Sequence, residues 1–233
     1  MKTFALILAL SSSVAGMGVI DMKMCEGDAM YQVKFTGTWT AANHPVSYPG
    51  DGPDGPNAHF SPVVAATSGY DDAFWKLGGM ATSGVEAVAE MGAAPALIDE
   101  LTTGSMKDAY LDVKHAPLEG LYFPWMTELM EPIKADTMHD HLGLATMIAP
   151  SPDWFTGASM IALCDYETGE WKEMVEYDAM AYDAGTEMGG TFSTTNDPED
   201  PHKAISMVMC MTDAFCAVGE DIKPVATIKV TKM

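Results

Sequence analysis

The feature that most constrains the fold of this chain is a set of short segments in which apolar and polar residues alternate. Tyr31–Phe35 and Ala226–Val230 both follow this pattern, which is typical of strands with one buried face. Leu142–Ile148 is mostly apolar on both faces, as expected for a covered central strand. Gly- and Pro-rich stretches connect such segments, so the sequence predicts an all-β fold, a β-sandwich with helical insertions.

The clearest helical signals lie between residues 83 and 103. Ser83 followed by Glu86 predicts a capped helix start, and Gly92 stands where a helix commonly ends. Pro95 then predicts the opening of a second helix over Ala96–Leu101. Both segments are short, so we expect them to be insertions in a β structure.

The first 16 residues combine one Lys, an apolar run from Phe4 to Leu10 and a small-residue end. This pattern predicts a secretory signal peptide over residues 1–16; a buried strand or a short membrane anchor is the alternative. Residues 17–233 show no linker and no repeat, and no later apolar run is long enough to span a membrane. We therefore expect one exported, extracellular domain over 17–233, without a transmembrane segment.

The charge balance restricts the partners. The chain has 12 Lys+Arg, none of them Arg, against 33 Asp+Glu, for a formal net charge of -21. Nucleic-acid binding needs a basic surface, so the composition argues against it. The sequence also contains no GxSxG, HExxH or P-loop motif, and we expect no enzymatic activity.

Four cysteines follow the leader, and four cysteines allow three disulfide connectivities. Cys210 and Cys216 are close in sequence, which favours a local bridge and leaves Cys25 to pair with Cys164. Export permits such bridges.

Carboxylates are abundant, and hard oxygen ligands suit Ca²⁺. Asp153 follows two prolines that stiffen its loop, and Gly185 allows a tight turn that can bring Asp183 and Glu187 towards one point. Asp153, Asp183 and Glu187 are thus candidate metal ligands. The alternative is two solvated turns with separate charges, and spacing alone does not decide between them.

Several motifs occur in an order that resembles the spondin N-terminal domain family, the family of F-spondin and mindin. They extend over some two hundred residues and include Phe35-Thr-Gly-Thr-Trp39, Ala58-His-Phe-Ser-Pro62, His141-Leu-Gly-Leu144, Pro150-Ser-Pro-Asp-Trp-Phe155 and Tyr182-Asp-Ala-Gly-Thr-Glu187. The resemblance implies an antiparallel β-sandwich like that of calcium-dependent lipid-binding domains.

The resemblance also implies a site and a function. Asp153 and Asp183 match calcium-binding aspartates of the family, and Glu187 stands where the family's Asp-Ala-Gly-Thr-Asp motif has its second aspartate. The family pattern supports the Cys25–Cys164 pairing. The expected function is that of a secreted, Ca²⁺-binding spondin domain that acts in the extracellular matrix or in cell adhesion, with a matrix or cell-surface protein as partner. Two alternatives are a pattern-recognition or integrin-like receptor-binding module of innate immunity, and an acidic calcium-buffering or mineral-associated protein.

Overall fold

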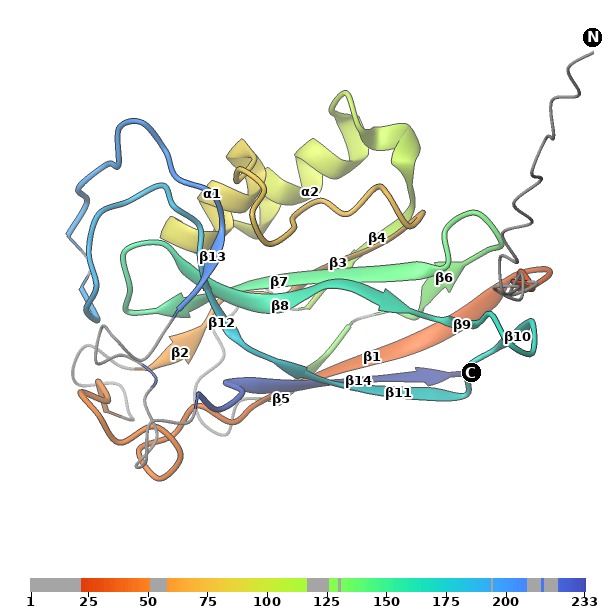
Figure 1. Cartoon of the computed structure of the whole chain (residues 1–233), viewed down its shortest axis with the longest axis horizontal. Helices are drawn as coiled ribbons and strands as arrows, with labels where there is room; N and C mark the ends of the chain where they lie inside the picture. Colours follow the sequence, from red (N-terminus) through yellow and green to blue (C-terminus); the bar gives the residue numbers. More distant parts are fainter. Residues whose placement is uncertain are drawn as a thin grey trace, which may run out of the picture.

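The computed structural model describes residues 22–50, 58–116, 126–129, 131–193, 195–208, 215 and 222–233. These residues form two antiparallel sheets that face each other (Figure 1). The first is a five-stranded sheet with the order β11-β14-β1-β5, in which β6 also pairs with β1. Its strands are β1 (Ala29–Gly37), β5 (Met126–Glu128), β6 (Ile133–Ala135), β11 (Met174–Ala179) and β14 (Ala226–Lys232).

The second sheet has seven strands in the order β13-β12-β8-β7-β3-β4, with β2 paired to the end of β7. Its strands are β2 (His59–Phe60), β3 (Val64–Ser68), β4 (Tyr110–His115), β7 (His141–Ala149), β8 (Trp154–Ala162), β12 (Ala181–Asp183) and β13 (Ser206–Met207). A small hairpin of β9 (Cys164–Asp165) and β10 (Glu170–Trp171) follows β8. The expected all-β, antiparallel sandwich is confirmed.

Two hydrophobic layers explain why the central strands are apolar. Alternate residues of β1 and β14, such as Tyr31 and Ile228, are fully buried against Leu142 and Leu144 of β7 between the sheets. The opposite face of β7, at Ala145, packs under the helices. Every residue of β7 is buried, which confirms the strand predicted from the apolar run.

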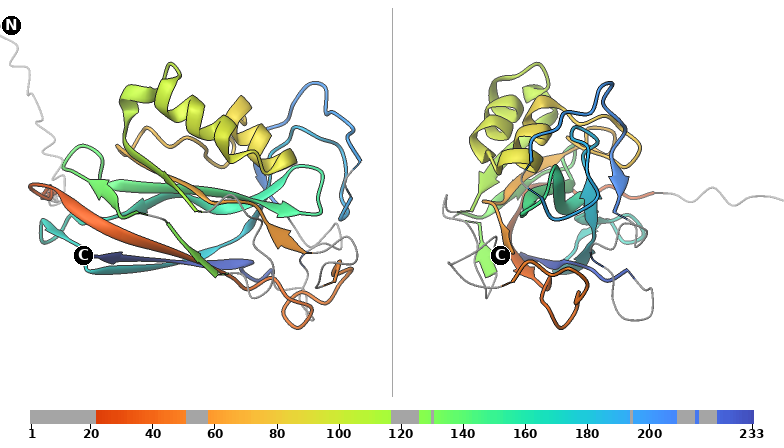
Figure 2. Two further views of the ribbon diagram at one scale, coloured as in Figure 1. Left: turned by 180° about the vertical axis from the view of Figure 1, so that it is seen from behind. Right: turned by 90° about the vertical axis from the view of Figure 1, so that its left-hand side faces the viewer.

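Helices α1 (Ser83–Met91) and α2 (Ala94–Thr103) cover the outer face of the seven-stranded sheet, and the short 3-10 helix η1 (Lys107–Ala109) follows (Figure 2). The predicted cap at Ser83 is wrong by one residue, because Thr82 is the N-cap and its hydroxyl accepts a hydrogen bond from the Val85 amide. Gly92 ends α1 in the left-handed conformation, as predicted.

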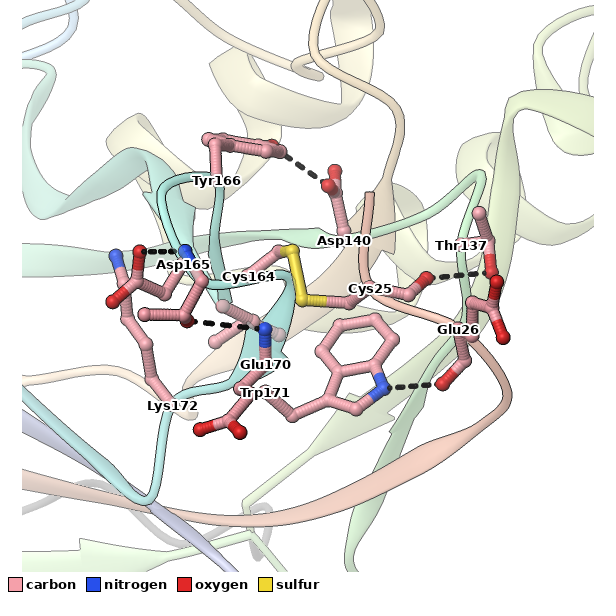
Figure 3. Close-up of a disulfide and its surroundings, with 12 residues drawn as sticks. Cys25, Glu26, Thr137, Asp140, Cys164, Asp165, Tyr166, Glu170, Trp171 and Lys172 are labelled. Atoms are coloured by element: carbon pink, nitrogen blue, oxygen red, sulfur yellow. Dashed lines mark hydrogen bonds between the residues drawn. A yellow bond between two sulfur atoms is a disulfide. The ribbon is translucent and has the colours of Figure 1, made fainter. Parts of the chain in front are cut away.

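A disulfide joins Cys25 to Cys164 across 139 residues and confirms the predicted pairing (Figure 3). It ties the segment before β1 to the start of β9. The proposed Cys210–Cys216 bridge and the predicted leader, residues 1–16, lie outside the described residues. Within the described part of the chain, no helix has the length and apolar character to cross a membrane.

Candidate functional site

Two turns that are distant in sequence meet at one end of the seven-stranded sheet. β7 leads into the turn that holds Asp153, and β12 leads into the turn that holds Gly185. Because β8 and β12 are antiparallel, with Asp183 opposite Trp154, the start of one strand and the end of the other lie together. The Ala184 amide donates a hydrogen bond of 3.1 Å to the Asp153 carbonyl oxygen. The turn between β7 and β8 is at the left in Figure 1.

Asp153 is the centre of this junction. Its carboxylate is fully buried, with 0% of the residue exposed. Oδ2 accepts hydrogen bonds from the amides of Thr186, at 2.7 Å, and Glu187, at 3.1 Å. Oδ1 has no hydrogen-bond partner among the described residues. Burying a hydrogen-bond acceptor without a partner costs free energy of folding. This oxygen is therefore a candidate to bind a cation or a water molecule.

Asp183 lies beside Asp153 and is half-buried. Its Oδ1 accepts a hydrogen bond of 2.8 Å from the Gly185 amide, and its Oδ2 accepts one of 3.2 Å from the indole of Trp154. Burial and the negative charge of Asp153 raise the pKa of Asp183 to about 6, although those two hydrogen bonds oppose the shift. The ionised form of Asp183 is therefore disfavoured at this place.

Gly185 makes the second turn possible. It has a positive φ of 75°, and an added Cβ would collide with the backbone carbonyl of Lys203. A side chain at this position would thus disturb both the turn conformation and its contact with the following segment. The expected role of Gly185 in the turn agrees with this geometry.

Glu187 is also buried at this junction, with 7% of the residue exposed. Its Oε1 accepts a hydrogen bond of 2.8 Å from the side-chain amide of Asn196. Burial raises the pKa of Glu187, and the charges of Glu90, Asp153 and Asp197 raise it further. Its carboxylate is therefore in the negative field of the same junction, but one of its oxygens already has a protein partner.

Sequence reasoning missed Glu90, which extends from α1 towards the two turns. Burial raises its pKa, a hydrogen bond with Thr186 lowers it, and the charges of Glu86 and Asp153 raise it. The available signal was the four-residue spacing of Glu86 and Glu90 on one helix face. We call Glu90, Asp153, Asp183 and Glu187 the acidic cluster.

Ser151, which sequence reasoning also missed, holds the first turn in shape. Its hydroxyl donates to the Ile148 carbonyl at 2.5 Å and accepts from the Trp154 amide at 3.0 Å. These bonds join the end of β7 to the start of β8. The loop that leads to Asp153 is therefore held in shape by Ser151 as well as by the two preceding prolines.

The chemistry of the acidic cluster suits a hard cation. Its side chains offer carboxylate oxygens and no sulfur or imidazole, which is the ligand type that Ca²⁺ prefers. However, among the described residues no group of three or more His, Cys, Asp or Glu side chains is arranged to hold a metal ion. A cation at Oδ1 of Asp153 would thus need backbone carbonyls and water to complete its shell. The set of Asp153, Asp183 and Glu187 stays a prediction.

The chain is thus an antiparallel β-sandwich with helices on one face. Its candidate site combines strand ends, turns and one helix residue. The Spondin_N family model matches residues 29–214. The chain is 31% identical to "Spondin-2" of Rattus norvegicus over 205 residues, which is 87% of this chain and 60% of that protein. It is 30% identical to "Spondin-1" of Homo sapiens over 190 residues, which is 80% of this chain and 22% of that protein. The chain belongs to the spondin N-terminal domain family.

These relatives are longer than the matched region. The chain covers 60% of the rat protein named Spondin-2, and 22% of the Bos taurus protein named Spondin-1, to which it is also 30% identical. The match therefore concerns only part of those proteins.

Proposed function

We propose that this chain is a secreted spondin module that binds Ca²⁺ at the acidic cluster and acts by adhesion, without catalysis, in the extracellular matrix or at a cell surface. The observation that supports the calcium proposal best is Oδ1 of Asp153, a buried carboxylate oxygen without a described partner. The raised pKa values of Asp183 and Glu187 add support, since a divalent cation would relieve the repulsion that contributes to them.

In this proposal Asp153 and Asp183 provide the protein's negatively charged ligands, and Glu187 is the third candidate. Glu187 has one oxygen bound to Asn196 and a second oxygen that can face the cation. Bound Ca²⁺ would stiffen the two turns and the nearby end of α1, and so hold one loop surface ready for a partner. Extracellular calcium modules function with dissociation constants of about 10⁻⁴–10⁻³ M.

Thermal unfolding with Ca²⁺ and with chelator tests the calcium proposal. At a Ca²⁺ concentration of about 100 times the dissociation constant, binding stabilises the folded state by about 2.7 kcal/mol. For a chain of this size the midpoint then rises by about 5–10 °C. The variant carrying Asp153→Ala and Asp183→Ala should lose this gain, whereas Asp178→Asn, an exposed aspartate of β11, should keep it.

If the double variant folds poorly, Asp153→Asn alone answers the same question, because it keeps the size of the side chain. A melting curve that does not change between Ca²⁺ and chelator contradicts the proposal. So does a calcium response that persists in both variants at position 153.

Membership of the spondin family supports the adhesion part of the proposal, and the net charge of -21 favours basic or calcium-bridged partners. The test is binding of the purified chain to cell-deposited matrix, measured in Ca²⁺ and in chelator. Saturable binding that Asp153→Asn weakens would support a calcium-dependent adhesive surface. Binding that is absent in both conditions would contradict it.

A further inference from the structure

A second candidate site lies at the other end of β7 from the acidic cluster. β7 starts at His141 and ends at Ala149, and nine strand residues span about 30 Å. The region around His141 is therefore too distant to contribute to the acidic cluster. It lies near the Cys25–Cys164 disulfide: Figure 3 shows Asp140 beside this bridge, and the Leu163 amide donates a hydrogen bond of 2.8 Å to the Asp140 carbonyl oxygen.

This end carries a pocket of about 600 Å³, which we call the methionine pocket. Its lining is mainly apolar, and four of the side chains are unusually exposed for their type. The exposed fractions are 74% for Tyr70, 71% for Met138, 61% for Met22 and 48% for Met24. Exposed apolar side chains that gather around one hollow mark an interaction site more often than scattered ones do.

The polar groups in the floor of the methionine pocket are hydrogen-bonded to one another. The buried Asp140 carboxylate bonds to His141 Nδ1 at 2.6 Å and accepts a hydrogen bond of 2.7 Å from the Tyr166 hydroxyl. Figure 3 shows Tyr166 and Asp140 pointing towards each other beside the disulfide. Because the floor is preorganised, an occupant would lose little free energy in ordering it.

Hydrogen bonds also fix the backbone segments that form the walls of the pocket. The Lys23 amide donates to the Tyr166 carbonyl at 2.9 Å, and the Thr137 hydroxyl donates to the Cys25 carbonyl at 2.8 Å. The segment that holds Met22 and Met24 is thus fixed against the turn that holds Met138. The exposed methionines are flexible side chains on a fixed backbone, a combination that adapts to varied apolar partners.

The charge of the pocket limits what it can hold. Asp71 and Asp72 are exposed at its edge and Asp140 lies in its floor, and none of the described lining residues is Lys, Arg or His. The whole chain is also strongly acidic. An anionic ligand is therefore repelled, whereas a cationic group is attracted to the rim and to the face of Tyr70.

We propose that the methionine pocket binds a peptide segment of a partner protein in which an apolar side chain the size of Leu or Phe stands next to Lys. The apolar side chain packs among Met22, Met24 and Met138, and the Lys ammonium contacts Asp71 and the ring of Tyr70. A volume of about 600 Å³ is in the range of pockets that hold one or two side chains or a small ligand. This interaction is independent of the acidic cluster and does not need Ca²⁺.

The test uses the full chain with carbon-13 in the methionine methyl groups and a synthetic probe, acetyl-Gly-Lys-Leu-Phe-Lys-Gly-amide. The methyl signals of Met22, Met24 and Met138 should shift on titration. Met91 on α1, with 70% exposed, is an internal control that should not shift.

Two variants measure how much the apolar contact and the negative charge each contribute to probe binding. Met138→Gln should weaken probe binding about tenfold by removing apolar contact, while Met91→Gln should have no effect. Asp71→Asn should weaken it about two- to fivefold, with Asp178→Asn as the matched control. Met138 and Asp71 are exposed, so both variants should keep the unfolding midpoint of the parent chain.

Two further probes decide the chemistry of the occupant. In one, both Lys are replaced by Glu, and in the other, Leu and Phe are replaced by Ser. The proposal expects neither to shift the three pocket methyl groups at the concentrations at which the first probe saturates them. Equal binding of either probe, shifts at Met91 as large as those at Met138, or no shift with the first probe would overturn it.

Discussion

Replacing Asp183 by Asn tests whether the acidic cluster is a strained arrangement that a cation relieves. Burial first, and the charge of Asp153 second, raise the pKa of Asp183 from 3.8 to about 6. A shift of about two units corresponds to about 3 kcal/mol at most. Because the side chain is only half-buried, solvent screening reduces this to roughly 1–2 kcal/mol.

Whether the free energy of unfolding rises or falls with pH depends on whether the folded or the unfolded chain binds the Asp183 proton more tightly. Without Ca²⁺, the folded chain keeps the Asp183 proton up to about pH 6, whereas the unfolded chain releases it near pH 3.8. The folded state then binds more protons in this window, so the free energy of unfolding falls as the pH rises from about 4 to about 6. The amide that Asp183→Asn introduces cannot ionise, and the variant should lose this part of the slope.

The change of the unfolding free energy with pH tests the pKa of Asp183 better than the unfolding free energy at a single pH does. An amide side chain can accept only one of the two hydrogen bonds that Asp183 receives from Gly185 and Trp154, which costs about 1 kcal/mol. His44 also titrates, since burial lowers its pKa, and it destabilises the fold as the pH falls below its ordinary value of 6.5. That effect is the same in both proteins and cancels in the difference.

The assay is urea unfolding in chelator, followed by circular dichroism, at several pH values between about 4 and 7. Asp178→Asn, with its exposed side chain, should leave the slope unchanged. Parallel pH profiles for the parent and Asp183→Asn would refute the reasoning. With Ca²⁺ present, the parent should lose calcium stabilisation as the pH falls through about 6, because protonated Asp183 cannot bind the ion.

Three further results are expected. Replacing Cys25 and Cys164 by Ala should lower the free energy of unfolding by about 2–5 kcal/mol, because the bridge closes a loop with a sequence separation of 139; unchanged urea midpoints would contradict this. Gly157→Ala should destabilise the chain severely, since its φ is 155° and an added Cβ collides with a carbonyl of β7; a soluble variant with a normal midpoint would show that reasoning to be wrong. Trp154→Phe removes the indole hydrogen bond to Asp183, so the pKa of that carboxyl should rise further and calcium affinity should fall at pH 6–7. Calorimetric titration measures the calcium affinity, and equal affinity in the parent and the variant would contradict Asp183 as a calcium ligand.

Much of the sandwich was predictable because its signals are local. The alternation in Tyr31–Phe35 and the apolar run of Leu142–Ile148 correspond to β1 and β7. Gly92 ends α1 as predicted, because a left-handed residue at a helix end is a local requirement. The N-cap is Thr82 and not the predicted Ser83, because adjacent Thr and Ser are both good caps and only the backbone conformation distinguishes them.

The site was predictable only in part. Asp153 and Asp183 were expected on strand-end loops, and the pairing of β8 with β12 brings those loops together. Glu90 and Asn196 were not expected, because they come from α1 and from a later loop whose approach depends on the packing of the whole domain.

The sequence by itself determined the period of the strands, the stiffness of the Asp153 loop, the turn at Gly185 and the excess of negative charge. These are properties of residues and their neighbours in the chain. Tertiary structure alone decided that Asp153 is fully buried, with one oxygen that has no hydrogen-bond partner among the described residues. It also decided that Met22, Tyr70 and Met138 surround one pocket. Burial and proximity between distant segments depend on how the two sheets and the helices pack, and no local pattern encodes those distances.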